Sequence, residues 1–301
     1  MRTSIPVSGT KPLAVPASAA ASRRRRPLLR ALGADPIAAA GAAFLVLVGL
    51  LAVAGPFAAR YTYDGQDLDA LFHGPSAAHW FGTDQFGRDS FTRIVYGARV
   101  SLSVGFAAVL GESVLGMTWG TVAGYFGGAW DQALMRVVDL LIGFPTILLA
   151  ILVTGIFGPS LANIVVALVL TAWPGTARII RSEVVAIRDR DYVEGARAAG
   201  ATTPRILARH LAPNVVHLLI VRATLDVSTL VLAEATLSFI GIGVQPPYPS
   251  WGQMIYDSFQ YLDSHPLQLV FPAAALSMTV IAFNLVGEFL SRVLDPRYAG
   301  R

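Results

Sequence analysis

The sequence contains no cysteine, and only 14% of its residues are charged. Without cysteine the chain has no disulfide framework, no thiol nucleophile and no zinc site built on thiolates. A soluble domain carries about 25% charged residues, so this low charge, together with a mean hydropathy of +0.57, favours a polytopic membrane protein. The net charge of +4 then reflects membrane orientation, and we expect no nucleic acid partner.

Lysine is almost absent as well. Lys11 is the only one and Pro12 follows it, so the sequence has no Gly-Lys-Ser/Thr phosphate-binding loop. Any ATP that drives this protein is therefore hydrolysed by another chain. The sequence also has no histidine pair at metal-ligand spacing, no nucleophile elbow and no convincing pair of catalytic carboxylates. We expect neither an enzyme nor a metal site.

Long apolar stretches with few charges recur along the chain. The first follows a basic run, as in a signal peptide, but it is long for a signal h-region and further stretches follow it, so we expect an uncleaved span. An open strand does not survive in lipid, so the expected fold is all-α. Six transmembrane helices are predicted, at residues 37–57, 100–125, 137–157, 161–177, 215–242 and 267–290, with Pro145 and Pro174 interrupting the third and fourth.

The arginines and lysines are spread unevenly over the connections. Seven precede the first span, seven lie between the fourth and fifth spans, and none follows the third or the fifth span. This distribution predicts a multi-pass protein of the cytoplasmic membrane with both termini in the cytoplasm. The high alanine and arginine content indicates a GC-rich bacterial genome. The expected parts are a flexible basic cytoplasmic tail (1–36), a first transmembrane helix (37–57), an extracytoplasmic connection (58–98), a five-helix core with a polar loop at 188–213 (99–293) and a cytoplasmic tail (294–301).

The polar segment 191–216 interrupts this apolar chain. Asp191 is suited to cap a helix over 192–199, with Glu194 in its first turn. Gly200 stops that helix, and Thr202 or Thr203 caps a second helix over 205–211 that starts with Pro204. Pro213 is expected to break or kink the second helix before the next span. The result is a helix–Gly–helix elbow whose small residues allow another surface to approach closely.

The spacing alone supports two interpretations of this elbow equally well. It is either a docking element or an amphipathic connector in the lipid headgroups, where its arginines would meet anionic lipid. A helix-turn-helix for DNA fits the turn and the charge, but the segment is short and held between membrane spans.

The elbow resembles the "EAA" loop of ABC-importer permeases, whose pattern is Glu-Ala-Ala, three residues, Gly, nine residues and Ile-x-Leu-Pro. Here Glu194-Gly195-Ala196 is followed by Gly200 and by Pro213 at the same spacing. The sequence departs from the pattern at Gly195, at His210 and at Ala212. These departures affect packing detail more than the elbow itself.

Three further stretches resemble the C-type permease of the dipeptide, oligopeptide and nickel branch. They are HWFGTDQFGRDSFTRIVYGARVSL (79–102), EATLSFIGIGVQPPYPSWGQM (234–254) and LDPR (294–297). Together with the elbow, the resemblance covers most of the chain from about residue 30 onward. It is far more specific than the elbow alone.

The resemblance implies a permease subunit that forms half of a translocation path in an ATP-driven peptide importer. The implied partners are a homologous second permease, two ATPase subunits, an extracytoplasmic solute-binding protein and membrane lipid. ATP and Mg would be bound by the ATPases, and this chain would bind no cofactor. The elbow would be the coupling helix, with contacts from Tyr192, Glu194, Gly195, Ala196, Gly200 and Pro213. Nickel, glutathione and haem-like cargo are carried by relatives of the same branch.

Two interpretations from other classes stay open at this point. An ATP-independent secondary carrier would be favoured by two broken or short spans in matching halves, and no such inverted pair is visible. A membrane scaffold without a path fits poorly, because charged residues lie inside the spans.

Charged residues within membrane spans are candidates for function by default. Arg222 and Asp226 are four residues apart and share a helix face with Glu234, so the first two can pair. Such a pair either locks the helices or takes part in the substrate path. The full set of intramembrane candidates is Arg222, Asp226, Glu234, Asp139, Glu112 and Glu288.

Two polar loops complete the set of candidates. The turn at 82–89 contains Asp84 and Asp89, but a calcium loop needs more oxygen ligands at regular spacing. We therefore expect a capped turn in which Arg88 pairs with a neighbouring carboxylate. The proline-rich loop at 246–249 is expected to end in Trp251 as an interfacial aromatic anchor.

Overall fold

The computed structural model describes residues 28–294 and confirms the all-α expectation. Within these residues the only β-type pairing is an isolated bridge between Thr83 and Asp89. A 3-10 turn covers Leu68–Ala70 and a π-helical turn covers Leu207–Leu211. The helices are α1 (Leu28–Gly33), α2 (Pro36–Ala58), α3 (Ser90–Phe126), α4 (Gly128–Ile142), α5 (Thr146–Phe157), α6 (Leu161–Ile187), α7 (Asp191–Ala198), α8 (Thr203–Ile206), α9 (Ala212–Phe239), α10 (Trp251–Phe259) and α11 (Leu267–Leu294).

Five helices are long and apolar enough to cross a membrane: α2, α3, α6, the run Thr203–Phe239 and α11. The predicted third span is not one straight helix, because α4 and α5 meet at 88°. The break falls at Pro145, as the sequence indicates, since the residue before a proline disfavours the helical conformation. Six spans result only if this bent pair counts as one. Pro174 does not interrupt the fourth span, because it lies inside the continuous helix α6.

Three predicted boundaries differ from the structure. Helix α3 begins at Ser90, so the first connection ends at Asp89 and not at residue 98; Asp89 caps the helix by accepting a hydrogen bond from the Thr92 N–H at 2.8 Å. Helix α6 continues to Ile187 instead of ending at residue 177. Part of the predicted flexible tail is the short helix α1, and residues 1–27 and 295–301 lie outside the described part of the chain.

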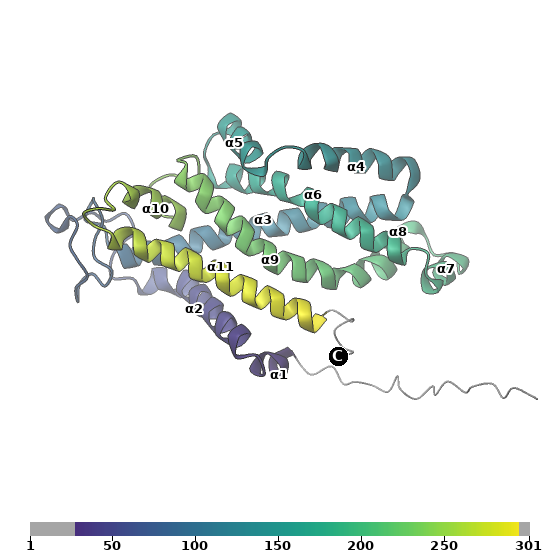
Figure 1. Ribbon diagram of the computed structural model, residues 1–301, viewed down its shortest axis with the longest axis horizontal. Coiled ribbons are helices and arrows are strands. Elements are labelled where there is room, and N and C mark those ends of the chain that lie inside the picture. The colour runs from purple at the N-terminus through teal and green to yellow at the C-terminus, as the bar shows by residue number, and fades with distance from the viewer. Residues whose placement is uncertain (1–27, 295–301) are drawn as a thin grey trace, which may run out of the picture.

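The long helices run side by side along the molecule, with α7 at one end and α10 and the 59–89 connection at the other (Figure 1). Helices α3 and α6 pack most closely. Gly116, Gly120 and Gly124 line their contact, and a Cβ added at Gly120 would lie 2.4 Å from the Ala177 carbonyl oxygen. Small residues four apart let two membrane helices approach in this way. We call the two ends of the bundle the α7 end and the α10 end.

The start of α2 and the last turn of α11 lie together. Arg292 donates to Asp35 at 2.8 Å, and Asp35 also caps α2 by accepting from the Ala38 N–H. The Ala38 hydrogen bond, helped by Arg292, lowers the pKa of Asp35. Figure 1 shows that both helix ends lie toward the α7 end, so the described chain enters and leaves on the side that carries α7.

Candidate functional site

Helix α7 is the centre of the elbow. It begins at Asp191, with Arg190 at the N-cap position and no capping bond from a side chain. The prediction that Asp191 caps the helix is therefore wrong by one residue. Asp191 and Glu194 both lie in the first turn, where the partial positive charge of the helix N-terminus stabilises them.

A single buried residue anchors α7 to the bundle. Val193 packs with Ile187 of α6 and with Ile206 and Leu211 of the second half of the elbow. Tyr192 is exposed, as are Glu194, Gly195 and the residues from 197 to 200. The helix is therefore fixed along one line and leaves the rest of its surface available to a partner.

The glycines of the elbow leave its backbone uncovered by side chains. Gly200 has φ +80°, a left-handed conformation that favours glycine and ends α7 as predicted. A Cβ added at Gly195 or at Gly200 would meet no atom within 4 Å. The open space at both positions allows another protein surface to approach the backbone.

The second half of the elbow is helical throughout and contains a π-helical turn just before Pro213, where the sequence predicts a break or kink. Pro213 does not break the chain before the next span: α8, the π-helical turn Leu207–Leu211 and α9 follow one another without a gap. The Ala212 N–H bonds to the Leu207 carbonyl, five residues back. A proline is tolerated here because it falls in the first turn of α9, just after the widened turn.

Several of the arginines that lie between the predicted fourth and fifth spans make contacts within the chain. Arg181 makes a bidentate contact with Asp131 of α4, at 2.6 and 2.5 Å, and Arg188 donates to the Gly124 carbonyl of α3 at 2.8 Å. Arg178 pairs with Asp139 at 2.6 Å, and both side chains are more than half exposed. Asp139 is thus an exposed ion-pair partner and not a buried intramembrane charge.

Arg222 and Asp226 do pair, with the Arg222 Nε 2.6 Å from Asp226 Oδ2. Glu112 of α3 is buried close enough to interact electrostatically with both charges. Its Oε1 has no hydrogen-bond partner among the described residues. The structure therefore joins three of the predicted intramembrane candidates in one cluster between α3 and α9. Glu288 lies apart, on the exposed side of α11.

Glu234 belongs to a separate cluster nearer the α10 end. It is fully buried and accepts hydrogen bonds from Ser101 of α3 at 3.0 Å and from Ser238 at 2.7 Å. Ser101 in turn accepts from the Trp251 N–H, and the Trp251 indole donates to the Ile94 carbonyl at 3.1 Å. Trp251 is therefore a buried anchor, and the prediction of an interfacial position is wrong. Its indole finds its partner inside the protein.

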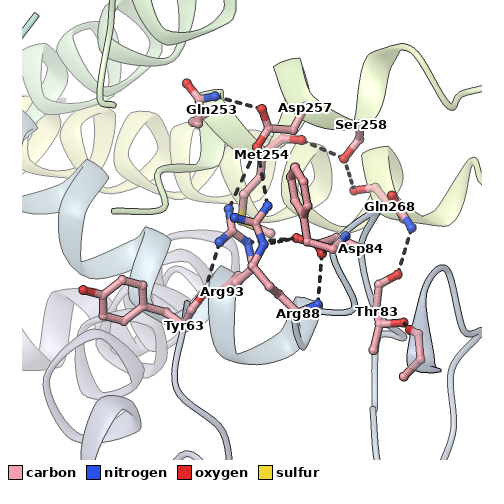
Figure 2. Close-up of polar contacts among 12 residues, drawn as sticks. Tyr63, Thr83, Asp84, Arg88, Arg93, Gln253, Met254, Asp257, Ser258 and Gln268 are labelled. Atoms are coloured by element: carbon pink, nitrogen blue, oxygen red, sulfur yellow. Dashed lines mark hydrogen bonds and ion pairs between the residues drawn. The ribbon is translucent and has the colours of Figure 1, made fainter. Parts of the chain in front are cut away.

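A charge network that the sequence indicates only at Arg88 lies at the α10 end (Figure 2). The Arg88 Nε lies 2.7 Å from Asp84 Oδ2, which confirms the expected pairing of Arg88. Arg93 lies 3.4 Å from the same carboxylate and donates to the Tyr63 carbonyl at 3.1 Å. Asp257 of α10 stands within 4.0 Å of both arginines. The network ties the first connection to α3 and α10.

Burial governs the chemistry of this network. It raises the pKa of the Asp257 carboxyl, although a 2.8 Å hydrogen bond from Gln253 and the two arginines act in the opposite direction.

The two carboxylates of the 82–89 turn already have partners. Asp84 is engaged by Arg88, and Asp89 contacts His79 at 2.9 Å while it caps α3. No group of three or more potential ligands for a metal ion occurs in residues 28–294. Both carboxylates of the 82–89 turn are thus engaged within the chain, Asp84 by arginines and Asp89 by His79 and the Thr92 N–H.

The comparisons with known proteins agree with one another. Residues 116–300 match the family described as binding-protein-dependent transport system inner membrane component, and residues 27–75 match the N-terminal TM domain of oligopeptide transport permease C. The chain is 43% identical to a dipeptide transport system permease protein of Bacillus subtilis, over 89% of this chain and 84% of that protein. It is 39% identical to a glutathione transport system permease protein of Escherichia coli, over 88% of each.

The fold has a solved counterpart. An inward-facing form of the MetNI methionine ABC transporter matches with a TM-score of 0.56 and 21% sequence identity, over 67% of this chain and 96% of that one. This likeness concerns the fold alone. Because the family match spans more than half of the chain, and close relatives align over nearly all of it, the chain belongs to the binding-protein-dependent inner membrane components, the permease subunits of ABC importers.

Proposed function

We propose that this chain is one of two permease subunits in an ATP-driven importer of short peptides. It pairs with a homologous permease, and two ATPases bind at the α7 end. Both termini lie in the cytoplasm and the α10 end faces the solute-binding protein. The peptide cargo rests on the relatives, which are named for dipeptide, oligopeptide and glutathione transport. Glutathione is itself a small peptide, so these names agree on a class of cargo.

The observation that carries this proposal is the build of α7. A helix held by one buried valine, with exposed small residues on its remaining surface, has the form of an insertion element. ATP-driven closure of the ATPases would move α7. Because α7 connects directly to α6 and, through the continuous α8–α9 run, to the next span, that movement would reach the transport path.

Substitution at the exposed small residues tests the docking role. Gly195→Trp fills space that is empty in this chain, so the chain should fold while the ATPase groove no longer accepts α7. We expect Glu194→Arg to act in the same direction. Gly33→Trp is the matched control, because Gly33 is also exposed at the α7 end, with no atom within 4 Å of an added Cβ.

The readouts are peptide uptake and ATP hydrolysis by the purified complex in proteoliposomes. Uptake should fall at least tenfold for Gly195→Trp and stay unchanged for Gly33→Trp. Uptake that survives both α7 substitutions would refute the docking role. A pull-down of the tagged chain that recovers no second permease and no ATPase, under conditions that preserve known complexes, would favour a secondary carrier.

A further inference from the structure

Arg222 is a charged residue deep inside the α9 span. It lies ten residues beyond Ala212, which places it about 15 Å along the helix at 1.5 Å per residue. Its guanidinium points toward Asp226, one turn further from the α7 end. A membrane arginine that only needs solvation extends toward the nearer headgroups. Arg222 does the opposite and holds its charge toward the middle of the span.

The members of this cluster differ in exposure. The Arg222 side chain is 40% exposed and that of Asp226 is 9% exposed, while Glu112 is 1% exposed as a residue. The cation thus forms the open side of the cluster, and the acids lie behind it. A guanidinium keeps its charge in proteins, and a charge facing lipid is costly. The open side of Arg222 therefore suits a polar path better than lipid.

The space beside the guanidinium is open. A Cβ added at Gly175 of α6 would meet only the Arg222 Nη2, at 3.8 Å, and no other atom within 4 Å. Toward the α7 end, a cavity of about 500 Å³ lies between α6, α9 and α11. Among the α9 residues that line this cavity, Val221 lies farthest from α7, and it is adjacent to Arg222 in the sequence. The rest of the lining is mixed: it contains the polar residues Glu183, Asn214, His217 and Ser291, Arg190 and Tyr192 near α7, and the apolar residues Ile187, Leu218 and Leu294.

The guanidinium also has donors to spare. It carries five N–H groups, and only the Nε group has an acceptor among the described residues, which is Asp226. The two Nη groups form the planar fork that matches a carboxylate. Every peptide with a free C-terminus carries such a carboxylate.

We propose that Arg222, positioned by Asp226, is a carboxylate-binding site in the transport path. It binds the carboxylate of a peptide that moves between the cavity bounded by α6, α9 and α11 and the open side of Arg222. This inference rests on the proposed peptide cargo. Asp226 and Glu112 lie behind the arginine and offset its charge, which keeps binding weak enough for release, as a transport path requires.

Paired substrates separate this role from a purely structural one. The purified complex is placed in proteoliposomes with its solute-binding protein, which is loaded to saturation with radiolabelled Ala-Phe or with the C-terminal amide of Ala-Phe. Uptake is measured per loaded binding protein, so that a difference in the affinity of the binding protein for the two substrates does not affect the comparison. We expect wild type to favour the free acid by about tenfold, the range of one hydrogen-bonded charge contact.

Arg222→Gln should lower uptake of Ala-Phe to the level of the amide and leave amide uptake unchanged. Arg222→Lys keeps the charge but loses the fork, so it should reduce the preference less, and it covers the case in which the Gln variant does not assemble. Arg178→Gln, which removes the exposed arginine paired with Asp139, is the matched control and should keep the full preference. A third substrate, the amide of Ala-Glu, shows whether a side-chain carboxylate serves as well as the C-terminal one.

Three results would overturn the inference. A wild type that transports both peptides without preference has no carboxylate site. Equal loss of both substrates in Arg222→Gln and Arg222→Lys, or a full preference that survives in Arg222→Gln, shows that the pair only locks the helices. A wild type that transports neither peptide refutes the peptide cargo itself, a failure that is visible before any variant is tested.

Discussion

At the α10 end, Arg88 and Arg93 are buried against Asp84 and Asp257, whereas at the α7 end Glu194 and most of α7 apart from Val193 are exposed. The α10 end also buries Trp251 and satisfies its indole inside the chain. The network at the α10 end fixes the first connection, α3 and α10 to one another. At the α7 end, most of the surface of α7 stays exposed.

This difference separates two tasks within one bundle. A buried ion pair is costly to break, because removing one partner leaves the other charge uncompensated. An exposed helix with one buried residue, Val193, and an Arg197 guanidinium 5.9 Å from the Tyr125 ring centre needs little free energy to be displaced, and its surface is accessible to a partner. We expect stability to be concentrated at the α10 end and coupling to the ATPases at the α7 end.

The largest effect should come from breaking the α10 network. Arg93→Ala removes a buried cation that contacts Asp84, Asp257 and the Tyr63 carbonyl. We expect a loss of about 3 kcal/mol or more in the free energy of unfolding. Thermal unfolding of the detergent-solubilised protein measures it. Arg60→Ala, at an exposed arginine of the same connection, is the control. Equal midpoints for the two variants would mean that the network does not hold this end together.

A smaller effect should come from two glycines of the elbow, with opposite signs. Gly200→Ala forces a left-handed backbone on a residue with a side chain and should destabilise the elbow by about 1 kcal/mol. Gly195→Ala lies within helix α7, where alanine is preferred, and should stabilise it by roughly 0.5–1 kcal/mol. Amide hydrogen exchange of residues 191–200 measures both. The same sign for both variants would contradict the assigned backbone conformations.

The smallest effect is a dependence on pH that differs between the two ends. Burial raises the pKa of Asp257, so its stabilising contribution is present at low pH and is lost as the pH rises through its folded-state pKa. The pKa of Asp35 is lowered, so its contribution is present above its unfolded-state pKa and is lost as the pH falls through the folded value.

Asn substitutions at the two positions test these signs. Relative to wild type, Asp257→Asn should gain stability as the pH rises, and Asp35→Asn should gain stability as the pH falls into the acid range. Unfolding midpoints measured between about pH 3 and pH 8, on both sides of an ordinary Asp pKa near 3.9, follow the two opposite trends. Parallel profiles for the two variants would show that the two ends do not differ in this respect.

The sequence predicts the apolar spans well, because lipid requires long uncharged helices whatever the tertiary packing. It also locates the elbow, since Gly200 and Pro204 have local conformational preferences that hold in the structure. It misplaces the end of α6, because the arginines that seem to close that span are used in pairs with α4 and α3. Composition does not reveal such partners.

What the sequence by itself determined is the class of protein and the place of its elbow. Hydropathy, the lack of a phosphate-binding loop and the spacing from Glu194 to Pro213 are local properties, readable without knowing what lies across the bundle. Only the tertiary structure decided that Arg93 meets Asp257 and that Glu234 meets Ser101, residues more than a hundred positions apart. It also decided that Arg222 has an open side. Burial and pairing depend on which helices pack together, and no single segment contains that information.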